Sequence, residues 1–452
     1  MSIKLVTGLG LALLAEGGLM AQGSLTVAES IRKAWAGQAG LRAGQALVDA
    51  RRAEAEGFRD LRLPSLTLRA QGIRTNEPMM AFGIKLNQAR IGAADFNPQS
   101  LNHPEAIGAY GGSAVLQQPL YAGGRISAAR RAGDYMAQAE AASQERRKQE
   151  TAQAVVEAYF GIQVAEQALR WVEDSRAWIQ GMEDFVDARV KQGLMLESER
   201  QRLKALHAQI DAQKADATRQ VRSARSGLGL LTGTGPVEGP LATPLTLDFE
   251  GRMHPSKEPA ERVEPGTPLP PGQRGDLQAA ELQARAAAEG AKAARGSLRP
   301  EVGLEVGAGT LHHAWADKGN WTWAAVGVTW KVFSAPDQAK ARAARAQERA
   351  ASDMRVFKQQ QAEHEIRVAR EFVLAAQARH AAAKESLAAA EESKRLREAR
   401  HREGLAPLID VLDAEAAIQG ARTLLLQSLY ELRVSRASLD LATGTPIEGV
   451  KP

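Results

Sequence analysis

The amino-acid sequence predicts a mixed, mainly α-helical fold in which two tandem repeats each combine a pair of β-strands with a long helical hairpin. Three observations support this prediction. The sequence matches itself at a nearly constant offset, residues 337–403 contain neither glycine nor proline, and short stretches near 65 and 301 alternate between apolar and polar side chains. A continuous helix over 337–403 would be about 100 Å long at 1.5 Å per residue, which no ordinary globular domain contains.

The repeat is visible at both ends of the strand pair. LQQPLYAGGR (116–125) aligns with VTWKVFSAPD (328–337) at an offset of 328 − 116 = 212. Upstream, RLPSLTL (62–68) aligns with LRPEVGL (298–304) at an offset of 298 − 62 = 236. The chain therefore holds two copies of one unit. The first copy has about 24 additional residues, 236 − 212, between its two strands.

The copies and their connections divide the chain into five parts. We assign a signal peptide to 1–23, the first repeat to 24–234, a linker to 235–272, the second repeat to 273–445 and a C-terminal tail to 446–452. The linker holds nine of the 19 prolines and is expected to pack around the middle of the helices or to be partly disordered. The expected strands and hairpins are about 65–75, 110–120 and 125–232 in the first copy, and about 301–310, 321–333 and 337–442 in the second.

The long helices show the pattern of a coiled coil. Small apolar residues recur at a 4,3,4,3 spacing in the second copy, namely at Ala362, Ile366, Ala369, Val373 and Ala376. Glycine follows each long helix, at Gly193 and Gly404, and favours a tight reversal of the chain. Each glycine precedes a leucine, Leu194 or Leu405. The sequence therefore predicts two antiparallel helical hairpins with Gly-Leu turns.

The N-terminus predicts that the chain is exported. Lys4, an apolar run from Leu5 and small residues near Ala21 are typical of a secretory signal, although Glu16 interrupts the apolar run. The run is shorter than the roughly 20 residues that a transmembrane helix needs. Since the sequence has no cysteine, the chain forms no disulfide and carries no lipid on a cysteine.

Composition argues against nucleic-acid binding and catalysis. The formal net charge is +5, but both signs alternate along the same segments, as in QERRKQE (144–150), which is typical of a solvated helix face. Of the eight histidines, His312 and His313 are adjacent and His364 and His380 are sixteen apart, so none has the spacing of a helical metal site. No phosphate-binding loop or nucleophile with a paired base is recognisable. We predict no catalytic residue, metal or cofactor.

The strand segments have the length and alternation of membrane strands. In SLTLRAQ (65–71), Leu66 and Leu68 lie opposite Thr67 and Arg69, and strands of 9 to 11 residues can cross a bilayer when tilted. Aromatic residues that would form a membrane girdle are Tyr110, Trp315, Trp321, Trp323 and Trp330. A soluble hairpin that caps a helical bundle explains the same pattern. Four strands cannot close a barrel, so membrane strands would require several chains to share one barrel.

These features together resemble the TolC-like outer-membrane efflux proteins. The resemblance covers nearly the whole mature chain: LTVAESIRKAW near the start, LQQPLYAGGR before the first long helix, the duplicated hairpins, and GLAPLIDVLDAEAA (404–417) at the second turn. It implies a homotrimer with a twelve-stranded β-barrel, four strands per chain, in the outer membrane of a Gram-negative bacterium, continued by a coiled-coil α-helical barrel in the periplasm. It also implies a passive exit duct that works with a periplasmic adaptor and an inner-membrane pump or ABC transporter, in efflux or type I secretion.

The resemblance also implies roles for residues at the hairpin turns. Asp410 and Asp413 match acidic rings at the closed end of the tube, where Glu199 and His401 are further candidates for the constriction. One branch of the family has Tyr and Arg gating residues at the positions of His401 and Ala406, so the closing network must be built differently here or be held less tightly. The Gly-Leu turns would be the tips that dock the adaptor.

Simpler explanations compete with these roles. Acidic residues in a first helical turn are favoured by the helix dipole, which would explain Asp410 without a pore, and Leu194 and Leu405 could merely pack their turns. Arg202 stands opposite Asp413 in the repeat (413 − 211 = 202), so capping alone does not require the second acid. For the whole protein, the main alternative is a soluble periplasmic coiled-coil adaptor or scaffold without membrane strands.

Overall fold

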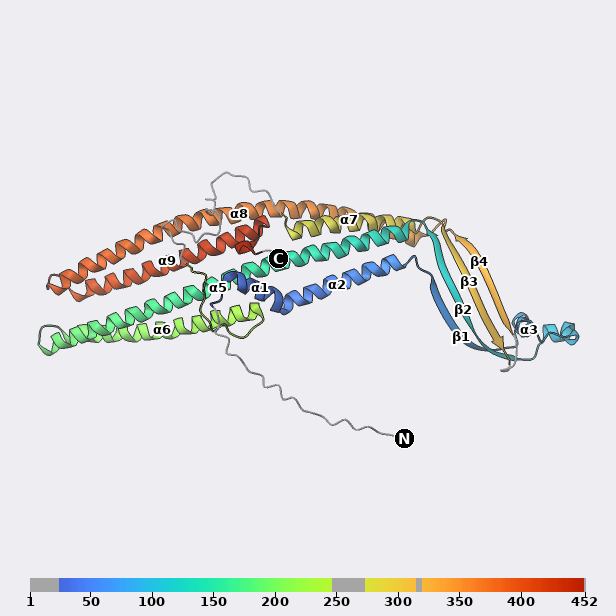
Figure 1. Ribbon diagram of the computed structural model, residues 1–452, viewed down its shortest axis with the longest axis horizontal. Coiled ribbons are helices and arrows are strands. Elements are labelled where there is room, and N and C mark those ends of the chain that lie inside the picture. The colour runs from blue at the N-terminus through green and yellow to red at the C-terminus, as the bar shows by residue number, and fades with distance from the viewer. Residues whose placement is uncertain (1–23, 246–272, 314–318, 451–452) are drawn as a thin grey trace, which may run out of the picture.

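The chain folds into an elongated molecule with long helices at one end and a curved β-sheet at the other (Figure 1). The structure is a computed structural model that describes residues 24–245, 273–313 and 319–450. The predicted signal peptide, most of the linker and Trp315 lie outside the described residues. The mainly helical fold with a four-stranded sheet agrees with the fold class predicted from the sequence.

Each copy contributes one helix or two ahead of its strands and a helical hairpin after them. The first copy comprises α1 (Val27–Gly37), α2 (Ala39–Asp60), β1 (Ser65–Thr75), α3 (Pro78–Asn87), η1 (Ala93–Phe96), α4 (Pro98–Asn102), β2 (Ile107–Ala122), α5 (Arg125–Lys191) and α6 (Glu197–Thr232). The second comprises α7 (Gly275–Gly296), β3 (Glu301–His312), β4 (Asn320–Thr329), α8 (Ala335–Arg402), α9 (Leu408–Thr443) and η2 (Ile447–Gly449). The additional residues of the first copy form α3, η1 and α4.

The long helices are covered along their whole length by shorter ones. α5 has 67 residues and α8 has 68. α6 packs on the half of α5 next to the turn, and α2 packs on the half next to the sheet (Figure 1). In the same way, α9 and α7 cover α8. The five small residues of the predicted coiled-coil seam, from Ala362 to Ala376, are all buried, which agrees with the spacing in the sequence.

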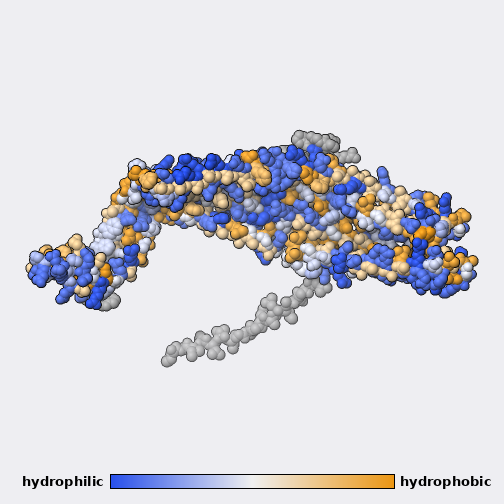
Figure 2. Space-filling view, turned by 180° about the vertical axis from the view of Figure 1, so that it is seen from behind, coloured by the Kyte–Doolittle hydropathy of each residue, from blue (hydrophilic) through white to orange (hydrophobic). Residues whose placement is uncertain are grey.

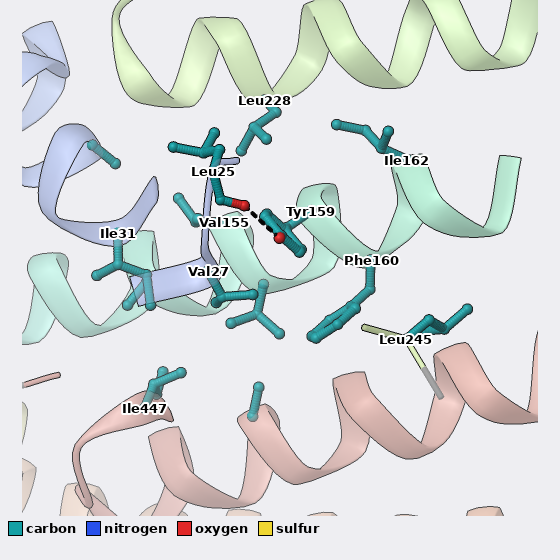
Figure 3. Packing of buried hydrophobic residues seen from close by; sticks show 14 of the residues in the cluster. Leu25, Val27, Ile31, Val155, Tyr159, Phe160, Ile162, Leu228, Leu245 and Ile447 are labelled. Carbon is teal, nitrogen blue, oxygen red and sulfur yellow. Dashed lines mark hydrogen bonds between the residues drawn. The ribbon is translucent and has the colours of Figure 1, made fainter. Parts of the chain in front are cut away.

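The main apolar core lies midway along the helices, where both copies meet (Figure 3). Tyr159 and Phe160 of α5 are fully buried there among side chains from α1, α6 and α9. The Tyr159 hydroxyl donates to the carbonyl oxygen of Leu25 at 2.6 Å and accepts from the backbone N–H of Thr243 at 2.9 Å. Leu25 also pairs with Leu241 in a parallel bridge. The described part of the linker is thereby fixed at the middle of the molecule.

The sheet is antiparallel with the order β1-β2-β3-β4, so β1 and β4 are its edges. β1 pairs with β2 over its full length, from Ser65 with Gln117 to Thr75 with Ile107. Among the described residues, the outer edges of β1 and β4 have no strand partner. These two edges, which are about as long as a strand that crosses a bilayer, are the open sides of the protomer.

Candidate functional site

The two faces of the sheet differ in polarity along all four strands. Because cross-strand partners point to the same side, the register defines an apolar face that includes Leu66, Leu68, Leu116, Val306, Val326 and Val328. The opposite, polar face includes Thr67, Arg69, Gln71, Gln117, Glu301 and Glu305. Leu68 and Val328 are exposed by 75% and 68%. A large exposed apolar surface of this kind marks a site that contacts lipid or another protein.

The tryptophans of β4 lie on the polar face. Trp321 pairs with Gly309 and Trp323 pairs with Gly307, in register with Glu305. Their rings lie so close to these glycines that a Cβ there would be 2.2 Å from a ring atom. Trp321 and Trp323 therefore lie on the face opposite to the apolar one, from which a girdle would contact lipid.

The other aromatic candidates differ in position. Tyr110 lies on the apolar face, with its ring centroid 6.2 Å from that of His312. Trp330 follows the end of β4, where its indole N–H donates to the Leu298 carbonyl at 3.2 Å. Tyr110 and Trp330 therefore stay candidates for the membrane boundary.

Both helical hairpins end in the same turn. Gly193 and Gly404 have φ values of +73° and +77°, the left-handed conformation that favours glycine. The backbone N–H of Leu194 donates to Arg189 O and that of Leu405 to Arg400 O, each at 2.9 Å, as in a Schellman motif. The two leucines are exposed by 62% and 73%, so they do not pack their own turns in this protomer. Figure 2 shows hydrophobic residues at the surface of this end of the molecule.

The two aspartates lie at the start of α9 without a capping role. Pro407 is the N-cap residue, and no side chain caps this helix. Asp410 is the third residue of the helix and is half-buried, whereas Asp413 is exposed and lies beyond the first turn. Among the described residues, neither carboxylate takes part in an ion pair. The helix dipole therefore accounts for Asp410 but not for Asp413.

The other two constriction candidates are half-buried. The His401 Nδ1 lies 2.8 Å from the Ala406 carbonyl oxygen, so this nitrogen carries the proton. The ring edge of His401 meets Phe185 of α5, at 6.2 Å between ring centroids. Glu199 is the third residue of α6, as Asp410 is of α9, and its Oε2 has no hydrogen-bond partner within the described residues. The structure thus places His401 and Asp410 at one hairpin and Glu199 at the other.

A polar network that the sequence analysis missed joins the two hairpins. Glu415 of α9 is only 6% exposed, and its carboxylate accepts hydrogen bonds from Ser175 of α5 at 3.0 Å and from Gln419 at 2.8 Å. Its other oxygen is ion-paired with Lys394 of α8. The Lys394 ammonium also lies 4.4 Å from the ring centroid of Trp178 of α5. One carboxylate therefore connects three long helices.

The network determines the charge state of Glu415. Burial alone would raise the pKa of this carboxyl, but hydrogen bonds from Lys394, Gln419 and Ser175 and the charge of Lys394 outweigh it and hold the pKa below its usual range. The indole N–H of Trp178 donates to Glu398 at 3.1 Å, which adds a second link between α5 and α8. These contacts fix one hairpin against the other some distance from the Gly-Leu turns.

The described residues lack both a metal-binding group and a membrane-spanning helix. No group of three or more His, Asp or Glu side chains is arranged to hold a metal ion in these residues. Within the same ranges, none of the helices is both long and apolar enough to cross a bilayer.

A two-faced sheet with open edges, two long helical hairpins and exposed turns are together the features of a channel subunit with a long helical extension. Solved structures with this fold include outer-membrane proteins. VceC from Vibrio cholerae is 19% identical with a TM-score of 0.76, and 93% of this chain and 96% of that chain are covered. The MtrE outer membrane channel of Neisseria gonorrhoeae, in its open state, is 20% identical with a TM-score of 0.74, with 94% and 90% covered.

A third structure, the CmeC outer membrane channel of Campylobacter jejuni, is 14% identical with a TM-score of 0.74, and 94% of this chain and 86% of that chain are covered. No curated protein sequence matches the chain. The model of the outer membrane efflux protein family matches residues 31–234 and 272–445. The chain belongs to this family. It is an efflux channel of the outer membrane that extends into the periplasm, and the alternative of a soluble adaptor is excluded.

Proposed function

We propose that three copies of the chain form one channel, with a twelve-stranded barrel in the outer membrane and a helical tube in the periplasm. The observation that carries this proposal is the four-stranded sheet with an apolar face and two open edges, β1 and β4. Four strands cannot close a barrel, and an open edge in lipid leaves backbone groups without hydrogen bonds. Pairing of β4 with β1 of the next copy satisfies both edges, and the polar face then lines the lumen.

The helical part supports a role as the exit duct of a tripartite system. Helices of 67 and 68 residues extend about 100 Å, and both turns lie at the same far end (Figure 1). The partners that fit this arrangement are a periplasmic adaptor, docked on the exposed Leu194 and Leu405, and an inner-membrane pump or ABC transporter behind it. The duct is passive, and efflux or type I secretion depends on the transporter.

The trimer can be tested by cross-linking, because the chain has no cysteine of its own. A variant with Leu68→Cys in β1 and one cysteine in β4, scanned over Ala324, Val326 and Val328, should form disulfide-linked trimers in the outer membrane at one register. Cysteines in the central pair, at Leu116 and Val306, face each other within one chain and serve as the control. A heat-labile monomer released by osmotic shock, without inter-chain disulfides, would refute the shared barrel.

We also propose that Asp410 and Asp413 line the constricted periplasmic end of the lumen. In a trimer each aspartate occurs three times around one axis. Like charges about 7 Å apart repel by roughly 0.6 kcal/mol per pair in water and about 2.4 kcal/mol at an effective dielectric of 20. Such rings are tolerable only in a wet lumen, where they attract cations. The absence of a capping hydrogen bond at α9 favours this role over a helix cap.

The acidic ring is tested by ion selectivity in planar bilayers. Replacement of Asp410 and Asp413 together by alanine should weaken cation selectivity and abolish block by multivalent cations applied from the periplasmic side, while trimers stay intact. Asp440→Ala, which replaces a half-buried acid at the other end of α9, is a matched control that should leave block unchanged. Unaltered selectivity and block in the double variant would place the constriction elsewhere, beginning with His401 and Glu199.

A further inference from the structure

The residues that distinguish the first copy from the second form a compact unit, which we call the β1–β2 insert (residues 76–106). It lies at the end of the sheet that is far from the long helices (Figure 1). Its main helix, α3, begins at Pro78, and the carboxylate of Glu77 accepts hydrogen bonds from the backbone N–H groups of Met79 and Met80 at 3.2 and 2.6 Å. The insert is therefore an ordered element with its own helix cap.

The insert is also braced internally. Lys85 is ion-paired with Asp95 at 2.8 Å, and the Asp95 carboxylate also accepts from the Gly92 backbone N–H at 2.8 Å. The rings of Phe82 and Phe96 meet edge to face at 6.0 Å between centroids. These contacts connect α3 with η1, so the insert moves as one body.

The decisive observation is the face of the sheet on which α3 packs. Ala81 and Ile84 of α3 are buried against Ile107, Ala109 and Leu311. In the register of the sheet, Ile107 pairs with Thr75 and Leu311 with Gly111, and these residues share a side with Arg69, Glu305 and Trp321. The insert is thus folded over the polar face and leaves the apolar face free.

Gly319, the residue before β4, also lies against the insert, next to Leu311. A Cβ on Gly319 would be 2.6 Å from the carbonyl oxygen of Asn87, the last residue of α3, and 2.4 Å from Leu311 O. Only glycine allows the backbone before β4 to approach α3 so closely. The insert therefore packs against segments of both copies.

We propose that three copies of the insert form a constriction at the outer exit of the channel, which limits the size of what passes. This inference rests on the proposed trimeric barrel, in which the polar face lines the lumen. Twelve strands spaced about 4.8 Å apart and tilted by about 40° give a barrel radius of about 12 Å. A helix with its side chains is about 10 Å thick, so three helices packed on the inner wall reach nearly to the axis.

The free side of the insert fits this position. Met79 and Phe96 are exposed by 80% and 62%, and Leu86 is also exposed. Around a threefold axis these apolar side chains face the other two copies across the narrow opening. The constriction is therefore an apolar collar, which contrasts with the acidic residues at the periplasmic end.

The test measures whether a thiol reagent added outside the cell reaches a single cysteine on the periplasmic side of the collar. The chain has no cysteine of its own. Ser113 lies on the polar face, six residues along β2 from Ile107. It is about 20 Å away along the strand at 3.3 Å per residue, which is about 15 Å inward for a strand tilted by about 40°. In intact cells, Ser113→Cys should react with a small charged maleimide but not with a bulky polyethylene-glycol maleimide. Ser100→Cys on the exposed α4 should react with both.

Two further variants remove the collar. In one, residues 76–106 are replaced by Asn-Gly, which closes Thr75 and Ile107 as a two-residue hairpin; in the other, Ile84→Asp undocks α3 from the sheet. Both should raise the reaction of Ser113→Cys with the bulky reagent by about tenfold or more, because a steric gate is removed. If heat-resistant trimers form and the bulky reagent reacts equally with and without the insert, the collar is refuted.

Failure of the proposed barrel gives a different result. Ala114 neighbours Ser113 on β2 but belongs to the apolar face. In a lipid-embedded barrel, Ala114→Cys should stay unreactive toward the small charged maleimide while Ser113→Cys reacts. Equal reaction at both positions, or the absence of trimers, would refute the membrane barrel itself rather than the collar.

Discussion

Replacement of Lys394 by methionine should destabilise the joint between the hairpins, because it leaves the buried carboxylate of Glu415 without its cation. Removal of one partner from a buried ion pair costs about 3 to 5 kcal/mol. Glu415 keeps neutral hydrogen bonds from Ser175 and Gln419, so we expect a loss near the lower limit, about 3 kcal/mol. Lys340→Met, an exposed lysine on the same helix, should change stability by less than about 0.5 kcal/mol.

The stability of Lys394→Met should depend on pH in the opposite direction from that of the wild type. In the wild type the Glu415 pKa is lowered, so its stabilising contribution is complete above the ordinary carboxyl pKa and is lost as pH falls through the lowered value. Without Lys394, burial is no longer opposed by that charge and the pKa rises. In Lys394→Met, Glu415 then contributes its full share to the free energy of unfolding at low pH, and this share is lost as pH rises through the raised pKa. Lys394→Met should therefore become more stable from pH 7 to pH 5, where the wild type should not.

The assay is thermal or guanidinium unfolding of the detergent-solubilised protein, followed by the circular dichroism of the helices at both pH values. Glu415→Gln together with Lys394→Met removes the buried charge and should recover most of the lost stability. A loss in Lys394→Met no larger than that in Lys340→Met, or an unchanged pH dependence, would refute the reasoning about this network.

Three other predictions follow from the strands, the turns and the end of α9. Val328→Arg on the apolar face should cost about 2 to 4 kcal/mol near the membrane midplane and prevent trimer assembly, whereas Thr329→Arg on the polar face should assemble; equal assembly would count against lipid contact. Leu405→Asp should leave trimers intact but abolish export and adaptor cross-linking, and normal export would exclude docking there. Burial raises the pKa of the Asp440 carboxyl to about 6, so its contribution is lost as pH rises through 6. Asp440→Asn should then be more stable than the wild type by about 1 to 2 kcal/mol at pH 8 but not at pH 4, as unfolding curves at both pH values will show.

The sequence was sufficient for the repeating architecture because periodicity determines it. Alternation at Leu66 and Leu68 predicted strands with two unlike faces, and the spacing from Ala362 to Ala376 predicted a buried seam. Glycine before leucine predicted both turns, where the left-handed backbone requires glycine. Each of these features depends on residues that are close together in the sequence, so the sequence alone can predict it.

Contacts between distant segments could not be predicted in the same way. Glu415 and Lys394 look like ordinary solvated charges of a helix, and only the packing of α5 on α9 brings Ser175 to the same carboxylate. The residue type of Trp321 predicts a place in the girdle. Side chains alternate between the faces of β4, however, so Trp321 lies on the face of the sheet that does not carry Val326 and Val328. That alternation was readable in the sequence and would have corrected the prediction.

The lengths of the two copies show which parts of the chain are free to differ. α6 and α9 each have 36 residues, and α2 and α7 each have 22. One extra residue would displace a turn by about 1.5 Å and rotate the following side chains by about 100°, which would move seam residues out of the core. The shorter helices are therefore matched in length between the copies, whereas α5 and α8 differ by one residue, at 67 and 68. Two further differences between the copies are the β1–β2 insert and Arg202 of α6, which stands where α9 has Asp413. These two differences lie at the two ends of the proposed duct, so selectivity should depend on the residues in which the copies differ.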